Sequence, residues 1–200
     1  MKIGSIILAG GKGERLGTQK SWAELGRVTL LQRAISNLEF LDSEIIVVKA
    51  PGAELPPVVT GISFKVVSDS VGGRGPLEGI LTGLSHSRYS YNLVTACDMP
   101  LLNKDFVKYL SSVAGGFDAV VPRVGPHLEP LHAVYSKRCI MEIEKLLAQD
   151  KLKVDALFDR VRTRFIEPVE IDRFDETHMC FMNINTRADL VKAEGLLGRS

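Results

Sequence analysis

A glycine-rich segment directly after the first apolar run constrains the fold more than any other feature. Residues 3–8 form a short apolar run that predicts a buried strand, and residues 8–17 read Leu-Ala-Gly-Gly-Lys-Gly-Glu-Arg-Leu-Gly. Glycines let backbone N–H groups approach an anion without interference from Cβ atoms. Arg15 and Lys20 add positive charge at the same place. The segment therefore predicts a nucleoside triphosphate site at the end of the first strand of an α/β fold.

Two familiar phosphate-binding motifs do not match this segment. A Walker A loop ends in Gly-Lys-Ser/Thr, but Gln19 precedes Lys20 here. A dinucleotide fingerprint needs Gly-x-Gly-x-x-Gly, and here the third glycine, Gly17, comes one position late. The remaining alternative is a flexible surface loop, although glycine-rich loops after an apolar strand usually hold ligands.

Composition narrows the class of protein. With 200 residues and 45% apolar residues, the chain suits one α/β domain with an ample core. A net charge of +1 argues against a dedicated nucleic-acid binder. The three cysteines are scattered without a Cys-x-x-Cys pair, which predicts buried apolar roles for them. No signal-peptide cleavage site and no membrane-length apolar run is visible, so we expect a cytoplasmic protein without a membrane or nucleic-acid partner.

Short apolar runs alternate with amphipathic ones along the chain. The predicted strands are residues 3–8, 44–49, 64–67, 91–97, 117–122 and 129–135, and the predicted helices are residues 29–38, 77–85, 103–110 and 137–149. Thr186 and Asp189 resemble a capping box that opens a last helix. Strand–helix alternation with continuous apolar strands indicates a mostly parallel sheet covered on both faces.

Acidic residues follow two later strands. Asp69 comes after the strand at 64–67, and Asp98 after the strand at 91–97. Because ligands bind beyond the carboxyl ends of parallel strands, we expect both to face the glycine loop in one crevice. Asp98 is a candidate Mg²⁺ ligand, since magnesium favours one or two carboxylates plus substrate phosphates. Asp69 would accept hydrogen bonds from a base or ribose, or join the metal shell. The alternatives are loop or capping roles.

Several motifs together resemble a known family. They are Leu-Ala-Gly-Gly at 8–11, Arg-Leu-Gly at 15–17, Lys20, Asp69 before Gly-Pro-Leu-x-Gly at 75–79, Cys-Asp-Met-Pro at 97–100, and Asn-Ile-Asn-Thr at 183–186. In this order and at these intervals they resemble the molybdenum cofactor guanylyltransferases, across nearly the whole chain. The resemblance implies a three-layer, Rossmann-like nucleotidyltransferase fold of the glycosyltransferase-A type.

The resemblance also implies a reaction, in which GMP passes from Mg-GTP to the terminal phosphate of molybdopterin, giving the guanine dinucleotide cofactor and pyrophosphate. It implies catalytic roles for Arg15, Lys20 and Asp98, with Asp98 as the Mg²⁺ ligand. The implied GTP contacts are Leu8, Ala9, Gly10, Gly11, Gly13, Lys20, Asp69 and Asp98. The candidate acceptor contacts are Lys151, Lys153, Asn183 and Asn185. We expect one domain spanning 1–200, with 1–100 mainly binding GTP and Mg²⁺ and 101–200 mainly the acceptor.

Two points leave alternatives open. Related cytidylyltransferases tend to carry alanine at the position of Gly10, so this glycine favours guanine. An asparagine that the family often has after its second strand is missing from residues 47–51, and its contact is lost, replaced by Lys49 or made by backbone. The alternatives are a cytidylyltransferase or another nucleotidyltransferase of the superfamily, or a catalytically silent nucleotide-binding protein. For the guanylyltransferase we expect GTP and molybdopterin as substrates and transient contacts with molybdoenzymes or other cofactor-biosynthesis proteins.

Overall fold

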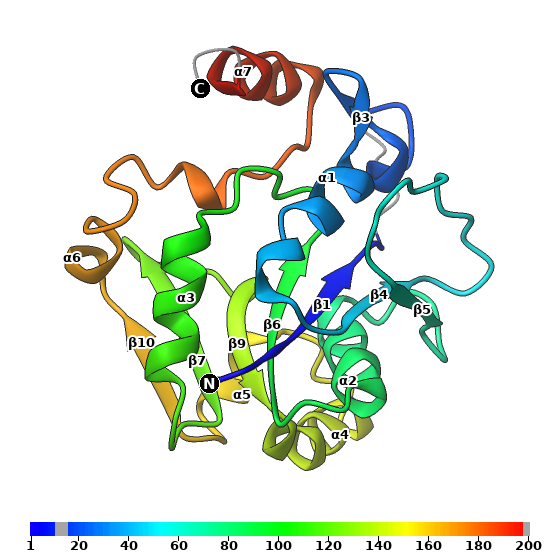
Figure 1. Ribbon diagram of the computed structural model, residues 1–200. Helices are drawn as coiled ribbons and strands as arrows, with labels where there is room; N and C mark the ends of the chain where they lie inside the picture. Colours follow the sequence, from blue (N-terminus) through cyan, green and yellow to red (C-terminus); the bar gives the residue numbers. More distant parts are fainter. Residues whose placement is uncertain (11–15, 198–200) are drawn as a thin grey trace.

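The computed structural model describes residues 1–10 and 16–197 and is built around an eight-stranded sheet (Figure 1). The strand order is β10-β7-β9-β6-β1-β4-β5, with β8 paired to β7. The strands are β1 (Gly4–Leu8), β4 (Ile45–Lys49), β5 (Phe64–Ser68), β6 (Tyr91–Ala96), β7 (Ala119–Val124), β8 (His127–Leu128), β9 (His132–Ser136) and β10 (Thr163–Ile166). β1 runs parallel to β4 and β6, β5 to β4, and β10 to β7, whereas β9 is antiparallel to β6 and β7. The predicted mostly parallel α/β sheet is confirmed.

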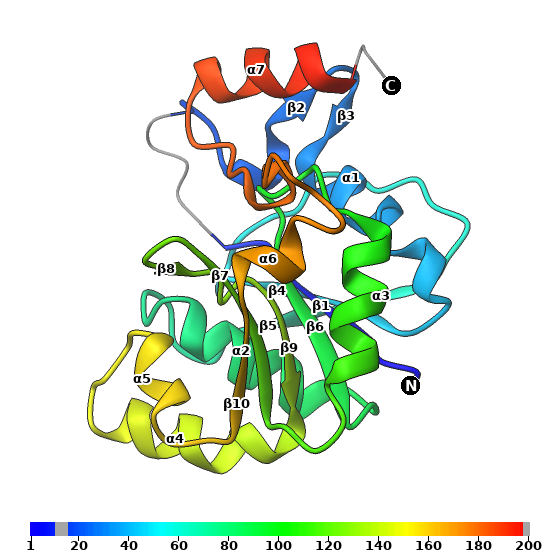
Figure 2. The same ribbon diagram turned by 90° about the vertical axis from the view of Figure 1, so that its left-hand side faces the viewer.

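Helices cover both faces of the sheet, so that the molecule has three layers (Figure 2). One face packs against α1 (Leu30–Ser36), α3 (Lys104–Val113) and α6 (Pro168–Ile171). The other packs against α2 (Pro76–His86), α4 (Ile140–Ala148) and α5 (Asp155–Phe158). All five residues of β1 are buried, because side chains on both sides of a central strand face a helical layer.

A small third cluster of apolar residues lies outside the two main layers. It joins a hairpin of β2 (Glu24–Leu25) and β3 (Val28–Thr29) to the last helix, α7 (Arg187–Leu197). Its buried members include Leu25, Leu30 and Ile184. Figure 1 places α7 and β3 beyond the ends of β1 and β6. The short 3₁₀ helix η1 (Lys20–Trp22) precedes the hairpin, so this unit carries Lys20 to the edge of the sheet where the predicted loops gather.

Most predicted elements are found with small shifts at their ends. Asn103 caps α3, its Oδ1 accepting hydrogen bonds from the backbone N–H groups of Asp105 at 3.0 Å and Phe106 at 2.9 Å, as predicted. The predicted helix at 137–149 begins as the 3₁₀ helix η3 (Lys137–Cys139) and continues as α4. Two further 3₁₀ helices are η2 (Glu39–Leu41) and η4 (Met179–Phe181). The sequence did not predict β2, β3, β8, β10, α5 or α6.

The three cysteines are buried and free, as the sequence predicts. Burial raises the pKa of the Cys97 and Cys139 thiols to about 12, so they remain protonated and unreactive near neutral pH. Within the described residues, no helix has the length and hydropathy needed to cross a bilayer.

Candidate functional site

A cavity of about 710 Å³ opens where β1, β5 and β6 end. Strand ends and the loops that follow them form its wall, the position where parallel α/β sheets bind ligands. The lining residues are Leu8, Ala9, Gly10, Gln19, Lys20, Val48, Ala50, Ala53, Asp69, Gly72, Gly73, Arg74, Gly75, Pro76, Gly79, Ala96, Asp98, Leu131 and Asn183. The predicted convergence of Asp69 and Asp98 with the end of the first strand is therefore present.

The end of β1 forms a rigid part of the wall. The Ala9 N–H donates to the carbonyl of Val48 at 2.8 Å, and the Leu8 carbonyl accepts from the N–H of Cys97 at 3.1 Å. Leu8 and Ala9 are buried, whereas Gly10 is exposed. A Cβ atom built on Gly10 meets no described atom within 4 Å, so packing against the described residues does not require glycine there.

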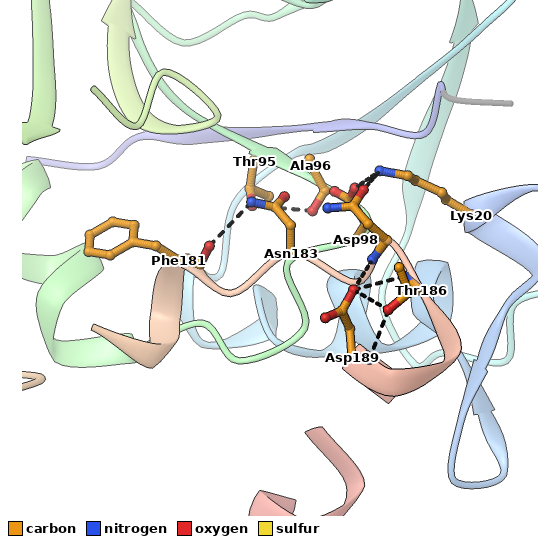
Figure 3. Close-up of polar contacts among 9 residues, drawn as sticks. Lys20, Thr95, Ala96, Asp98, Phe181, Asn183, Thr186 and Asp189 are labelled. Atoms are coloured by element: carbon orange, nitrogen blue, oxygen red, sulfur yellow. Dashed lines mark hydrogen bonds and ion pairs between the residues drawn. The ribbon is translucent and has the colours of Figure 1, made fainter. Parts of the chain in front are cut away.

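Lys20 and Asp98 form an ion pair in the cavity wall (Figure 3). Their side chains are 21% and 9% exposed, so the pair is largely removed from solvent. The Lys20 ammonium also donates to Oδ1 of Asn185 at 2.6 Å. Burying a carboxylate is costly unless it is paired, and Lys20 supplies that pairing for Asp98.

Asp69 is held beside a second carboxylate. Burial raises the pKa of Asp69, the Thr82 hydroxyl partly offsets that rise, and the negative charge of Glu78 adds to it. Oδ1 of Asp69 and Oε2 of Glu78 are buried and have no hydrogen-bond partner in the described part of the chain. The other Glu78 oxygen accepts from the N–H of Val71 at 3.2 Å and so fixes the loop after β5. Asp69 thus lines the cavity with a carboxylate that has one buried oxygen without a partner among the described residues.

The positively charged loops near the cavity have specific partners. The Arg74 guanidinium donates to the carbonyl of Leu147 near the end of α4. This bond connects the loop between β5 and α2 to that helix. Lys49 donates to the carbonyl of Ala53 at 2.6 Å and is not among the cavity-lining residues. The positive φ of Gly75, +76°, turns the chain into Pro76, the first residue of α2.

The candidate acceptor residues are divided between two places. Asn183 lines the cavity, and its amide nitrogen donates to the carbonyl of Phe181 at 3.3 Å, whereas Asn185 contacts Lys20 instead. Lys151 and Lys153 are exposed in the loop between α4 and α5 and do not line the cavity. The carbonyl oxygen of Leu152, between them, lies 3.9 Å from a Cβ built on Gly75, so this basic loop borders the rim.

Three of the predicted phosphate contacts, Gly11, Gly13 and Arg15, lie outside the described residues. Their roles stay predictions. Sequence reasoning missed Gln19 and Leu131 as lining residues, and Glu78 as the partner of Val71. A signal for Glu78 existed, because an acidic residue in the first turn of a helix is common, but its burial at 4% exposure depends on the tertiary fold.

The described part of the site has few side chains that could bind a metal ion. Among residues 1–10 and 16–197, no group of three or more histidine, cysteine, aspartate or glutamate side chains is arranged to hold a metal ion. That pattern excludes a structural zinc-type cage from this part of the chain. It fits a magnesium ion held by one carboxylate, with phosphate oxygens and water completing its shell. Asp98 is the carboxylate that the sequence predicts for that role, and Asn183 lines the same cavity (Figure 3).

Known proteins share this architecture and much of the sequence. The family model of the MobA-like NTP transferase domain matches residues 5–163. A "Probable molybdenum cofactor guanylyltransferase" from Pelotomaculum thermopropionicum is 37% identical, the match covering 94% of this chain and 90% of the relative. A relative of the same name from Methanosarcina mazei is 38% identical, with 98% and 90% covered.

A solved structure agrees on the fold. The molybdopterin-guanine dinucleotide biosynthesis protein A of Archaeoglobus fulgidus superposes with a TM-score of 0.82 at 23% identity, over 99% of this chain and 100% of that one. The match to the family model runs from β1 to the first residue of β10 and includes every cavity-lining residue except Asn183, and the matches to the two relatives extend through the asparagine segment. The chain belongs to the MobA-like NTP transferase family.

Proposed function

We propose that this protein transfers GMP from Mg-GTP to the terminal phosphate of molybdopterin, giving the guanine dinucleotide cofactor and pyrophosphate. The observation that carries the proposal is the cavity itself, where Leu8, Ala9, Gly10, Lys20 and Asp98 meet. The family resemblance implies that these residues contact GTP. The names of the curated relatives support the same reaction. The cytoplasm, where GTP is plentiful, is the proposed location.

Nucleotidyl transfer asks little covalent chemistry of a protein. It requires two anionic groups held in line and their charge compensated while pyrophosphate leaves. Lys20 is suited to this because its ammonium already faces the cavity, paired with a carboxylate that it can exchange for phosphate. Arg15, Gly11 and Gly13 are the further proposed phosphate contacts, through a guanidinium and through backbone N–H groups.

The proposed metal is Mg²⁺, held by Asp98, and Asn183, which lines the same cavity, is proposed to contribute its amide oxygen directly or through water. A bound magnesium ion supplies Lewis-acid polarisation of a phosphate oxygen. The role of Asp98 in this chain is to provide a carboxylate that is already desolvated. The role of Lys20 is to balance that carboxylate until the substrates arrive.

The base and sugar are proposed to bind between the end of β1 and the loop after β5. Leu8 and Ala9 offer an apolar wall, and the carboxylate of Asp69, which also lines the cavity, is the proposed acceptor for N–H or hydroxyl donors. No atom of residues 1–10 or 16–197 would lie within 4 Å of a Cβ on Gly10, so these residues leave space beside this wall. A purine is larger than a pyrimidine, so this space supports the preference for guanine over cytosine.

The acceptor is proposed to approach from the rim formed by residues 101–200. Leu131 and Asn183 line the cavity from that half of the chain, and the exposed ammonium groups of Lys151 and Lys153 border it. This arrangement supports one domain over 1–200, in which 1–100 mainly binds GTP and Mg²⁺ and 101–200 mainly the acceptor. Delivery of the product to molybdoenzymes would involve transient contacts at the same rim.

The decisive experiment offers the purified protein GTP, CTP, ATP and UTP in turn, with Mg²⁺ and molybdopterin, and measures pyrophosphate release. We expect release with GTP, its loss on chelation of the metal, and a fall of about 10²-fold or more in Lys20→Ala and Asp98→Asn. Release with CTP but not GTP would identify a cytidylyltransferase. No release with any nucleotide, given competent acceptor, would support a silent nucleotide-binding protein. Full turnover of either variant would contradict the assigned roles.

A further inference from the structure

The segment of residues 184–189 contacts both members of the Lys20–Asp98 ion pair. The Ile184 N–H donates to the backbone carbonyl of Asp98 at 2.8 Å, and the Asn185 side chain accepts from Lys20 at 2.6 Å. Ile184 itself is fully buried in the third apolar cluster. Two consecutive residues thus join the strand end that carries Asp98 to the 3₁₀ helix that carries Lys20.

The carboxylate of Asp189 holds this segment in shape. Its Oδ2 accepts from the backbone N–H groups of Asn185 at 3.0 Å and Thr186 at 2.8 Å, and from the Thr186 hydroxyl at 2.9 Å (Figure 3). In the cap of α7, the Asp189 N–H donates to the side-chain hydroxyl oxygen of Thr186 at 3.2 Å. Capping of α7 does not require the bond between Asp189 and the Asn185 N–H. That bond instead fixes the backbone from which the Asn185 side-chain amide extends.

We propose that Asp189 is a positioning residue for Lys20, because it fixes the backbone of Asn185 and thereby the amide that orients the Lys20 ammonium beside Asp98. Asp189 does not line the cavity and acts only through Asn185. This inference rests on the proposed function, in which Lys20 leaves Asp98 to bind phosphate. Asn185 is then the contact that keeps the ammonium in place, since it is neutral and does not compete with phosphate for charge.

The test begins with Asp189→Ala. We expect kcat/KM for GTP to fall about tenfold, the effect of losing one hydrogen bond to a charged group. In a Lys20→Ala background the same substitution should change kcat/KM less than about twofold, because its target is gone. Asp189→Asn should recover most of the activity, since its amide oxygen can still accept from both backbone N–H groups. A loss of equal size in both backgrounds would overturn the proposal.

Thr186→Ala is the matched control. It removes the hydroxyl that caps α7 but keeps both backbone N–H groups that bind Asp189. If Asp189 served only the helix end, the two alanine variants would lose activity and thermal stability together. We expect instead that Thr186→Ala lowers the free energy of unfolding while retaining kcat/KM near that of the wild type.

A second measurement does not depend on turnover. Brief labelling with acetic anhydride, quantified by mass spectrometry, reports how firmly each ammonium is held in the resting protein. Asp189→Ala should increase labelling of Lys20 severalfold relative to Lys49, which is bound to the carbonyl of Ala53 and serves as internal reference. Unchanged labelling of Lys20 would overturn the proposal. If the wild type released no pyrophosphate, the proposed function would fail, and labelling alone would decide the role of Asp189.

Discussion

The ammonium of Lys20 and the carboxylate of Asp98 form an ion pair although 78 positions separate them in the chain. Lys20 comes from a 3₁₀ helix outside the main sheet, and Asp98 from the end of a central strand. Each charge compensates the burial of the other. Both are also the residues expected to meet phosphate and metal, so the resting protein satisfies its own charges in the site that its substrates would occupy.

This pairing predicts a coupling in stability. Lys20→Met preserves most of the side-chain volume but leaves the Asp98 carboxylate without its counter-charge, so we expect the free energy of unfolding to fall by about 2 kcal/mol. Adding Asp98→Asn should recover most of that loss, because no buried charge then remains. Chemical denaturation of the two single variants and the double variant measures the coupling. Simple additivity would show that the pair contributes nothing specific.

Substitution of Gly10 should change base selection without changing the stability of the fold. Since a Cβ atom at this position meets no described atom within 4 Å, Gly10→Ala should leave the free energy of unfolding within about 0.5 kcal/mol of the wild type. The added methyl group occupies the space proposed for a purine, so the ratio of kcat/KM for GTP over CTP should fall. Steady-state rates with both nucleotides test this. An unchanged ratio would assign base selection to other residues.

The parts of this molecule that follow local rules could be predicted from the sequence. β1, β4 and β6 are continuous apolar runs, and their burial on both faces is the pattern expected of a parallel sheet. Asp69 and Asp98 could be placed together because each directly follows a strand. β10 was not predicted, because its residues Thr163–Ile166 are mostly half-buried at the sheet edge and carry a weak apolar signal.

Contacts that depend on tertiary packing could not be predicted. Lys20 and Asn185 lie 165 positions apart, and their hydrogen bond exists because the β2–β3 hairpin packs against α7. Neither element has a strong periodic signal, since each strand of the hairpin has only two residues. The sequence predicts that Asn185 binds the acceptor, which stays a prediction, and it gave no sign of the hydrogen bond that Asn185 accepts from Lys20. Local motifs identify the residues of this site, but packing decides which of them meet.

Protonation of Asp69 should weaken nucleotide binding as the pH falls. Its pKa is raised by burial and by the charge of Glu78, so it takes up a proton at a higher pH than an ordinary aspartate as the solution is acidified. If its carboxylate binds GTP, affinity should decline from that higher pH downward. Glu78→Gln removes the neighbouring charge but can still accept from Val71, so the decline should shift to lower pH. Calorimetric titration at several pH values measures both. Asp69→Asn should abolish the decline, and a persistent decline would point to another group.

His132 predicts a loss of stability in mild acid. It is fully buried against the rings of Phe106 and Phe181, and neither ring nitrogen has a hydrogen-bond partner in the described part of the chain. Burial lowers its pKa from 6.5 to about 4. Below pH 6.5 the unfolded chain gains a proton that the folded protein does not, so stability decreases as pH falls until the folded pKa is reached. The total effect is about 3 kcal/mol.

The matched variant for this effect is His132→Leu, which cannot take up a proton. Its free energy of unfolding should change less between neutral pH and mild acid than that of the wild type, whatever its absolute stability. Urea denaturation across this range provides the comparison. Parallel pH profiles for the two proteins would assign the acid sensitivity to carboxylates instead.

Alanine should have different effects at two glycines of α2, Gly79 and Gly83. A Cβ on Gly79 would lie 3.1 Å from one methyl carbon of Leu8 and 3.8 Å from Oδ2 of Asp69, both cavity residues. Leu8 can give way at its flexible end, and alanine favours the helix by about 0.5–1 kcal/mol, so Gly79→Ala should fold well. Because the shifted Leu8 narrows the proposed base site, KM for GTP should rise severalfold.

Gly83, one turn further along α2, serves as the control. A Cβ there would overlap the side chain of Ile6, approaching its Cδ1 to 2.9 Å, in a fully buried part of the core. Overpacking of this kind costs about 1–3 kcal/mol, more than the helical gain. Gly83→Ala should therefore lower the midpoint of thermal unfolding but leave KM for GTP unchanged, since Ile6 does not line the cavity. If both variants changed KM alike, α2 would act on the site as a whole and not through the contact between Gly79 and Leu8.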